Sequence, residues 1–182
     1  MRARQPNWTE WIENPDESKA GFNYYLRKNL ITLSEDRSAR HLKKTNHNLR
    51  LASWLFSKQQ TELQPLFHET FYDWVISVYY YAIYHAALAL VSSQGYKTKT
   101  HSATICFLIA NNYHANKNLN KQDINLVAHS LSKEDIEIIG DIKDLRERAS
   151  YDADAVFEGK LAERVSKNAS DFITKIKLLL NK

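Results

Sequence analysis

The sequence is poor in the residues that end strands or cross-link a small protein. Its 182 residues include four glycines, three prolines and one cysteine. So few turn-forming residues exclude a protein built from many short strands, because each strand must end in a turn. The single cysteine, Cys106, excludes an internal disulfide, and its apolar neighbours indicate a buried small residue rather than a nucleophile. Helices are therefore the expected structure.

The sequence also lacks the patterns of export and of membrane insertion. Its opening residues, MRARQP, do not lead into an apolar segment with a small-residue cleavage site. The longest apolar stretch, Trp74 to Val91, approaches the length that crosses a membrane, but it contains Ser77, His85 and several tyrosines. We interpret this stretch as the central buried helix of a soluble protein, and we expect a reducing cytoplasm and no membrane partner.

Neither the size nor the composition of the chain demands a cofactor. A chain of this length buries roughly 70% of its unfolded surface, so one core suffices without a metal or a disulfide. The histidines show no metal-cage spacing with carboxylates or cysteine, and no glycine loop that cradles phosphates is present, so no metal or other cofactor is predicted.

The net charge of +4 is modest, and its excess lies early in the chain. A phosphate-bearing partner would explain this basic cluster, and so would an ordinary solvated helix face. The cluster comprises Arg37, Arg40, Lys43, Lys44 and Arg50.

The spacing of the apolar residues predicts an all-α domain, an up-and-down bundle of four to six helices. Residues 1–15 are polar apart from two tryptophans, Trp8 and Trp11, and are expected to form an N-terminal arm, which leaves 16–182 as the domain. Gly95 is expected to end the central helix in a left-handed conformation. Polar composition predicts a connector at 59–65 and a loop at 111–123. The expected helices span about 16–30, 38–58, 67–93 and 99–109, and two more begin at the capping residues Ser132 and Asp154.

Three segments of the chain carry a pattern beyond helix periodicity. Residues 79–86 read YYYAIYHA, residues 95–102 read GYKTKTHS, and residues 145–152 read LRERASYD. This set resembles one branch of the HEPN superfamily, which has a YYA-x-[FY]-HA segment, a KTHS segment and an L-R-x-x-A-D-Y-D signature in the same order. The resemblance covers about residues 24–180 and leaves the preceding arm unmatched.

The resemblance implies a helical bundle that dimerises and places its signature arginines in a cleft between two protomers. Many relatives are metal-independent ribonucleases, acting as toxins beside a minimal nucleotidyltransferase antitoxin or inside antiviral defence systems. Their active site is an arginine followed after four to six residues by a histidine. That pair suits RNA cleavage through the 2′-hydroxyl, because imidazole moves protons near neutral pH and guanidinium stabilises negative charge on the phosphorus centre.

The chain departs from this pattern at the position of the histidine. Tyr151 stands five positions after Arg146, with four residues between them, and a phenol with a pKa of about 10 starts about 4 kcal/mol behind an optimally tuned base at pH 7. Five residues of regular helix rotate by about 140°, so the two side chains meet one phosphate only if the helix bends or ends between them, or if a second protomer completes the site. We predict Arg146 and Tyr151 as the catalytic pair, with His85 or His101 as alternative sources of the missing imidazole.

Three further residues are predicted to bind RNA. Arg148 shares the signature with Arg146, although an exposed ion pair with Asp144, four residues earlier, explains it as well. Lys99 and His101 lie near an expected helix start, where free backbone N–H groups and a cation favour phosphate. His85 lies among apolar neighbours, where a hydrogen-bonded core histidine is the commoner case.

Three functions follow from these observations. The first is a ribonuclease effector that uses Arg146 with Tyr151 or a nearby histidine. The second is a non-catalytic RNA-binding relative that uses the same basic cleft. The third is a protein-interaction module, a helical dimer that docks on a nucleotidyltransferase or a defence partner through its tryptophan-bearing arm. An RNA-directed function is favoured over a pure scaffold by analogy of fold.

Overall fold

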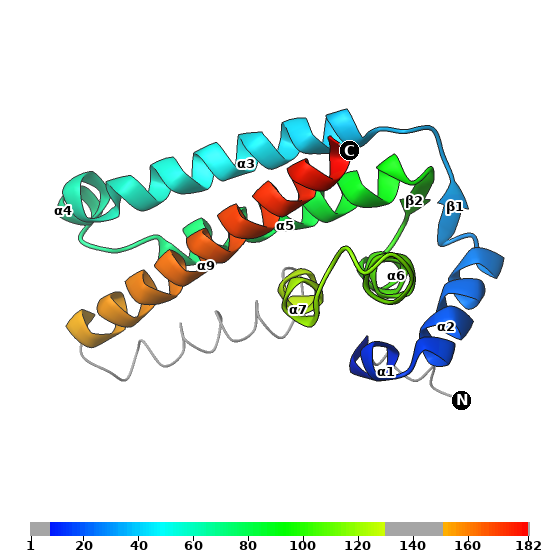
Figure 1. Cartoon of the computed structure of the whole chain (residues 1–182). Coiled ribbons are helices and arrows are strands. Elements are labelled where there is room, and N and C mark those ends of the chain that lie inside the picture. Colours follow the sequence, from blue (N-terminus) through cyan, green and yellow to red (C-terminus); the bar gives the residue numbers. More distant parts are fainter. Residues whose placement is uncertain (1–7, 130–150, 182) are drawn as a thin grey trace.

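The computed structural model describes residues 8–129 and 151–181, and of residues 151–158 the backbone only. The described residues are almost entirely helical, apart from one pair of short strands. The expected all-α class is therefore confirmed. Three long helices lie side by side and form the body of the bundle (Figure 1): α3 (Ser38–Lys58), α5 (Tyr72–Ser93) and α9 (Tyr151–Leu180).

Two helices precede this body. α1 (Trp8–Glu13) lies within the segment expected to form an arm, and α2 (Pro15–Arg27) follows it directly. The side chain of Asn14 caps α2 by accepting backbone N–H hydrogen bonds, and the proline that follows is tolerated because the first helical residue needs no N–H donor. The rings of Trp11 and Tyr25 meet edge to face with centroids 6.1 Å apart, so α1 packs against α2 and the core.

A two-stranded antiparallel sheet closes one end of the bundle. β1 (Ile31–Leu33) pairs with β2 (Tyr96–Thr98), with Ile31 opposite Thr98. The expected glycine cap after the central helix is confirmed, because Gly95 has a φ of +80° and leads the chain from α5 into β2. The strands themselves were not predicted, since three residues are too few to show a strand period.

The prediction of a polar connector at 59–65 is wrong, because this segment is helical. It forms a π-helical turn, η1 (Gln59–Leu63), and a short helix, α4 (Gln64–Phe67), so the central helix begins at Tyr72 rather than 67. The cause is the fully buried side chain of Gln59. It donates to the carbonyl of Leu55 (3.1 Å) and accepts from the N–H of Phe71 (2.7 Å), which ties the segment to the start of α5.

The loop expected after residue 110 is also largely helical. α6 (His101–Phe107) continues as a π-helix, η2 (Leu108–Ala115), and α7 (Lys121–His129) begins within the expected loop. Buried Asn112 explains the difference, because its side chain exchanges two hydrogen bonds with Gln94 at 2.7 and 3.4 Å. One of the asparagines that suggested a solvated loop, Asn112, is therefore buried and hydrogen-bonded.

α5 is the centre of the core, as the sequence predicted. It is long and apolar enough to cross a membrane, but α3 and α9 pack along it, and 61% of its apolar 18-residue stretch is buried inside the protein. Its fully buried side chains include Val75, Tyr79 and Ile83. The candidate span is thus the core helix of the bundle.

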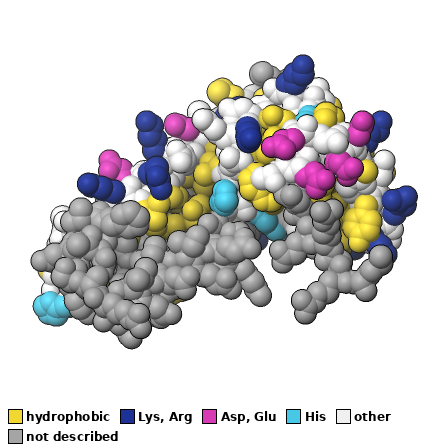
Figure 2. All heavy atoms as spheres, turned by 90° about the horizontal axis from the view of Figure 1, so that it is seen from below, with side chains coloured by type: hydrophobic (Ala, Val, Ile, Leu, Met, Phe, Trp, Pro, Cys, Tyr) yellow, Lys and Arg dark blue, Asp and Glu magenta, His cyan; other side chains and the backbone are white. Residues whose placement is uncertain are grey.

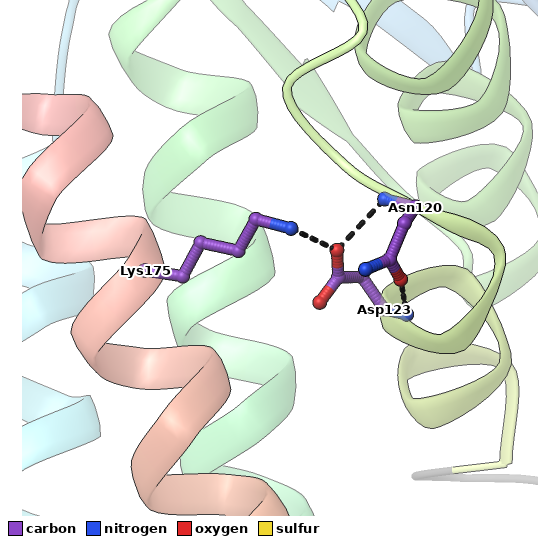
Figure 3. Close-up of polar contacts among 3 residues, drawn as sticks. All are labelled: Asn120, Asp123 and Lys175. Atoms are coloured by element: carbon purple, nitrogen blue, oxygen red, sulfur yellow. Dashed lines mark hydrogen bonds and ion pairs between the residues drawn. The ribbon is translucent and has the colours of Figure 1, made fainter.

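The last helix, α9, starts earlier than expected, so Asp154 lies inside it and does not cap it. The helix expected to begin at Ser132 lies outside the described residues. α9 is joined to α7 by the contacts in Figure 3. Asp123 accepts from the N–H of Asn120 at 2.8 Å, the Asn120 side chain accepts from the N–H of Asp123 at 2.9 Å, and Lys175 of α9 pairs with the same carboxylate.

Candidate functional site

The predicted site residues divide between described and undescribed parts of the chain. Arg146 and Arg148 lie outside the described residues, and Tyr151 is the first residue of α9, where only the backbone is described. The described geometry therefore concerns Lys99, His101 and the two histidines that stack between α3 and α5, His41 and His85.

Lys99 and His101 stand in different environments although only one residue separates them. Lys99 follows β2, donates its backbone N–H to the carbonyl of Leu30 (2.9 Å) and exposes its side chain. His101 begins α6 and is half-buried, with Nε2 donating to the carbonyl of Ala128 in α7 at 3.2 Å. Thr100 already caps the N–H of Ala103 at 3.2 Å, so one of the donors expected to receive a phosphate is occupied.

The two central motif segments meet in space through Tyr84. The Tyr84 ring packs against that of His101 with centroids 5.2 Å apart, and its hydroxyl is 3.2 Å from the hydroxyl of Thr104. Thr104 in turn lies 2.6 Å from the hydroxyl of Thr98. Burial raises the pKa of Tyr84 above its ordinary value, so this phenol stays protonated. The hydroxyls of Tyr84, Thr98 and Thr104 thus form a polar network that joins α5, β2 and α6, and the His101 ring packs against it.

A second group of imidazoles lies between α3 and α5. The rings of His41 and His85 stack with centroids 5.8 Å apart and planes inclined by 29°. Among the described residues, the Nδ1 atoms of both rings are buried without a hydrogen-bond partner, as is Nδ1 of His101. His85 therefore differs from the hydrogen-bonded core histidine that its apolar neighbours suggested. The pairing of His41 with it was missed because the sequence does not reveal which residue of α3 faces His85.

Burial keeps these imidazoles neutral at pH 7. Desolvation, followed by the charge of Lys44 and by His41, lowers the pKa of His85 to about 4. Desolvation, followed by the charges of Lys44 and Arg37, lowers the pKa of His41. Desolvation likewise lowers the pKa of His101, against the opposing effect of its backbone hydrogen bonds. Each ring can accept a proton or a hydrogen bond, but none carries a charge to hold a phosphate.

A metal centre is not assembled in the part of the chain that the structure describes. No three histidine, cysteine or carboxylate side chains gather there within reach of one ion. Burial raises the pKa of Cys106 to about 12, so its thiol remains protonated, as expected for a buried small residue.

Comparison with models of protein families gives a match over most of the chain. A family model described as HEPN domain matches residues 40–179, which run from the first turn of α3 to the end of α9 and include all three motif segments. No curated protein and no solved structure matches the chain.

Proposed function

The chain belongs to the HEPN domain family, and from this membership we propose that it is an RNA-directed effector. The observation that carries the proposal is the extent of the match, because it includes the LRERASYD segment at 145–152 as well as the central helix.

The proposed reaction is metal-independent cleavage of RNA. The 2′-oxygen attacks the adjacent phosphorus, the bond to the 5′-oxygen breaks, and the products are a 2′,3′-cyclic phosphate and a 5′-hydroxyl. Arg146 stabilises the negative charge on the phosphorus centre, and Tyr151 takes the proton of the 2′-hydroxyl and returns a proton to the leaving 5′-oxygen. Arg148 and Lys99 hold the phosphates of the substrate, and His101, which is neutral, contributes hydrogen bonding beside them. A second protomer completes the cleft in this proposal, and a cytoplasmic toxin or antiviral defence protein is the role it fits.

The second candidate is a relative that does not cut. It is favoured by Tyr151, which stands in place of the histidine. It is also favoured by His85, whose low pKa and buried Nδ1, unpartnered within the described part of the chain, make that ring a weak substitute. Such a protein would bind RNA in the same cleft, or would dock on a nucleotidyltransferase as an interaction module.

One experiment separates these candidates. Purified protein is incubated with total tRNA and mRNA in EDTA, and the new RNA ends are analysed for cyclic phosphate. The nuclease predicts cyclic ends that appear with the wild type and fall about a hundredfold with Arg146→Ala. An intact RNA pool with retained RNA binding supports the non-catalytic relative, and an absence of both cleavage and binding overturns the RNA-directed function.

A further inference from the structure

We propose that the exposed face of α3 is a second RNA-contacting surface, separate from the motif cleft, that follows the backbone of single-stranded RNA and stacks one base on Trp54. This inference rests on the proposed RNA-directed function and adds the place and the form of the RNA that binds. We call the surface the α3 face and define it by Arg40, Lys43, Lys44, His47, Arg50 and Trp54.

Helix geometry places these side chains on one side of α3. They follow one another at intervals of one, three or four residues, so they form a single stripe along the helix. All six are exposed, whereas the opposite side of the helix buries Thr45 and Ala52 against the core. Each turn of about 5.4 Å presents at least one cation, histidine or tryptophan, which is a regular array for a polyanion.

The charge on this face is uncompensated. No aspartate or glutamate occurs from Arg37 to Thr61, and none of the lysines and arginines of the α3 face pairs with a carboxylate among the described residues. The same charges act on the neighbouring imidazole, because after desolvation Lys44 and Arg37 lower the pKa of His41. In contrast, the face of the molecule seen from below mixes Lys and Arg with Asp and Glu (Figure 2).

The face is also uncovered by the rest of the described structure. α3 lies along the upper edge of the bundle in Figure 1, and α5 and α9 pack on its other side. From Arg40 to Trp54 the stripe is about 21 Å long, at about 1.5 Å per residue. That length suits a short run of nucleotides.

Trp54 favours single-stranded RNA over a duplex or an acidic protein. Its side chain is 53% exposed, and it ends the row of cations rather than packing into the core. Aromatic side chains in basic grooves stack on unpaired bases, and a base inside a duplex offers no free ring face. The combination of evenly spaced cations and one exposed indole therefore matches a single strand.

The test is a binding experiment with RNA that cannot be cut. The probe is a fluorescent 20-nucleotide single strand whose 2′-O-methyl groups prevent its cleavage. Fluorescence anisotropy in EDTA measures the affinity of the protein for this strand at several salt concentrations. Lys43→Gln/Lys44→Gln removes two charges from the α3 face. Lys19→Gln/Lys28→Gln is the matched control, because it removes two exposed lysines from around α2.

We expect the α3 double variant to bind about 25-fold more weakly at 0.1 M salt and the control to bind like the wild type. Each lost phosphate contact lowers the slope of log affinity against log salt by about 0.7, which is about fivefold at that salt concentration. Trp54→Ala should weaken binding about fivefold or more without changing the slope, and Trp54→Phe should restore most of it.

Four outcomes overturn this surface. The first is equal affinity of the wild type and the α3 double variant for the RNA strand. If Arg146→Ala still weakens RNA binding, that result rejects the α3 face but not the proposed function of the motif cleft. The second is an unchanged affinity of Trp54→Ala combined with equal binding of a duplex competitor. The third is an α3 double variant that no longer binds vesicles containing phosphatidylserine, to which the wild type binds, but that keeps its affinity for RNA. That result would make the face a membrane contact. The fourth is a wild type that binds no RNA at 0.05 M salt, which overturns the proposed function as well.

Discussion

Acid should destabilise the fold through the stacked histidines, and His85 is the residue that reports it. Its pKa is about 4 in the folded protein, against 6.5 for an ordinary histidine. Between pH 6.5 and 4 the His85 ring is protonated in the unfolded chain but mostly neutral in the folded protein. The free energy of unfolding therefore falls as the pH falls from 6.5 to 4. Above pH 6.5 both states are neutral at this ring and the stability from His85 is fully present.

The size of the effect follows from the two pKa values. At pH 5 the unfolded ring is charged and the folded ring is mostly neutral, which corresponds to a loss of about 2 kcal/mol at most. Because the ring is only half-buried and solvent screens part of the charge, we expect about 1 kcal/mol. His41 and Lys44 of α3 act on the same ring.

The assay is urea unfolding by circular dichroism at pH 7.5 and 5.0, on wild type and His85→Gln. The variant should lose about 1 kcal/mol less than the wild type between the two pH values, because glutamine does not titrate. His47→Gln is the matched control, since His47 is exposed on α3 and its replacement should leave the acid loss unchanged. Equal losses in wild type and His85→Gln would show that the folded protein does not hold this imidazole neutral.

Three further predictions concern the fold and the assembly. Asp123→Asn should lower the free energy of unfolding by about 1 to 2 kcal/mol in a thermal or urea melt, because it weakens the α7 cap and the contact with Lys175, whereas exposed Asp171→Asn should have little effect. Gln59→Leu should cost about 1 to 3 kcal/mol in the same melts despite its added apolar surface, since it leaves the N–H of Phe71 unpaired. The chain should be a homodimer by light scattering at micromolar concentration, with an interface that includes the region 146–151 and part of α5. A monomer would contradict this prediction. Replacing the exposed Trp74 of α5 by serine should weaken the dimer.

The sequence predicted the long helices because their apolar residues repeat with the helical period. α3 has the bounds that its pattern indicates, and Gly95 ends α5 as expected. The errors fall where a polar side chain is buried. Gln59 and Asn112 belong to residue types that are usually exposed, and only the packed structure shows that their hydrogen bonds stabilise helices where composition indicated a connector and a loop.

The candidate site was less accessible to prediction than the fold. A motif identifies residues that belong together, and Tyr84 and Thr98 do belong to one polar network, against which the His101 ring packs. It does not reveal contacts with residues outside the motif, such as His41 against His85. That contact depends on the rotation of α3 against α5, and rotation is set by the packing of many side chains.

The pH dependence of RNA cleavage distinguishes the groups that could replace the missing histidine. A phenol ordinarily titrates near pH 10, so with Tyr151 as the base the single-turnover rate in EDTA should rise about tenfold per pH unit between pH 6 and 9. With His85 as the base the rate should be flat over that range, because a ring with a pKa of about 4 is already deprotonated. His101 predicts a flat profile too above neutral pH, since desolvation lowers its pKa. We expect the rising profile, and we expect Tyr151→Phe to remove the rise while leaving RNA affinity unchanged. A bell-shaped profile centred near pH 7 would exclude Tyr151 and His85 as the base, because an ordinary phenol titrates near pH 10 and the His85 ring has a pKa of about 4.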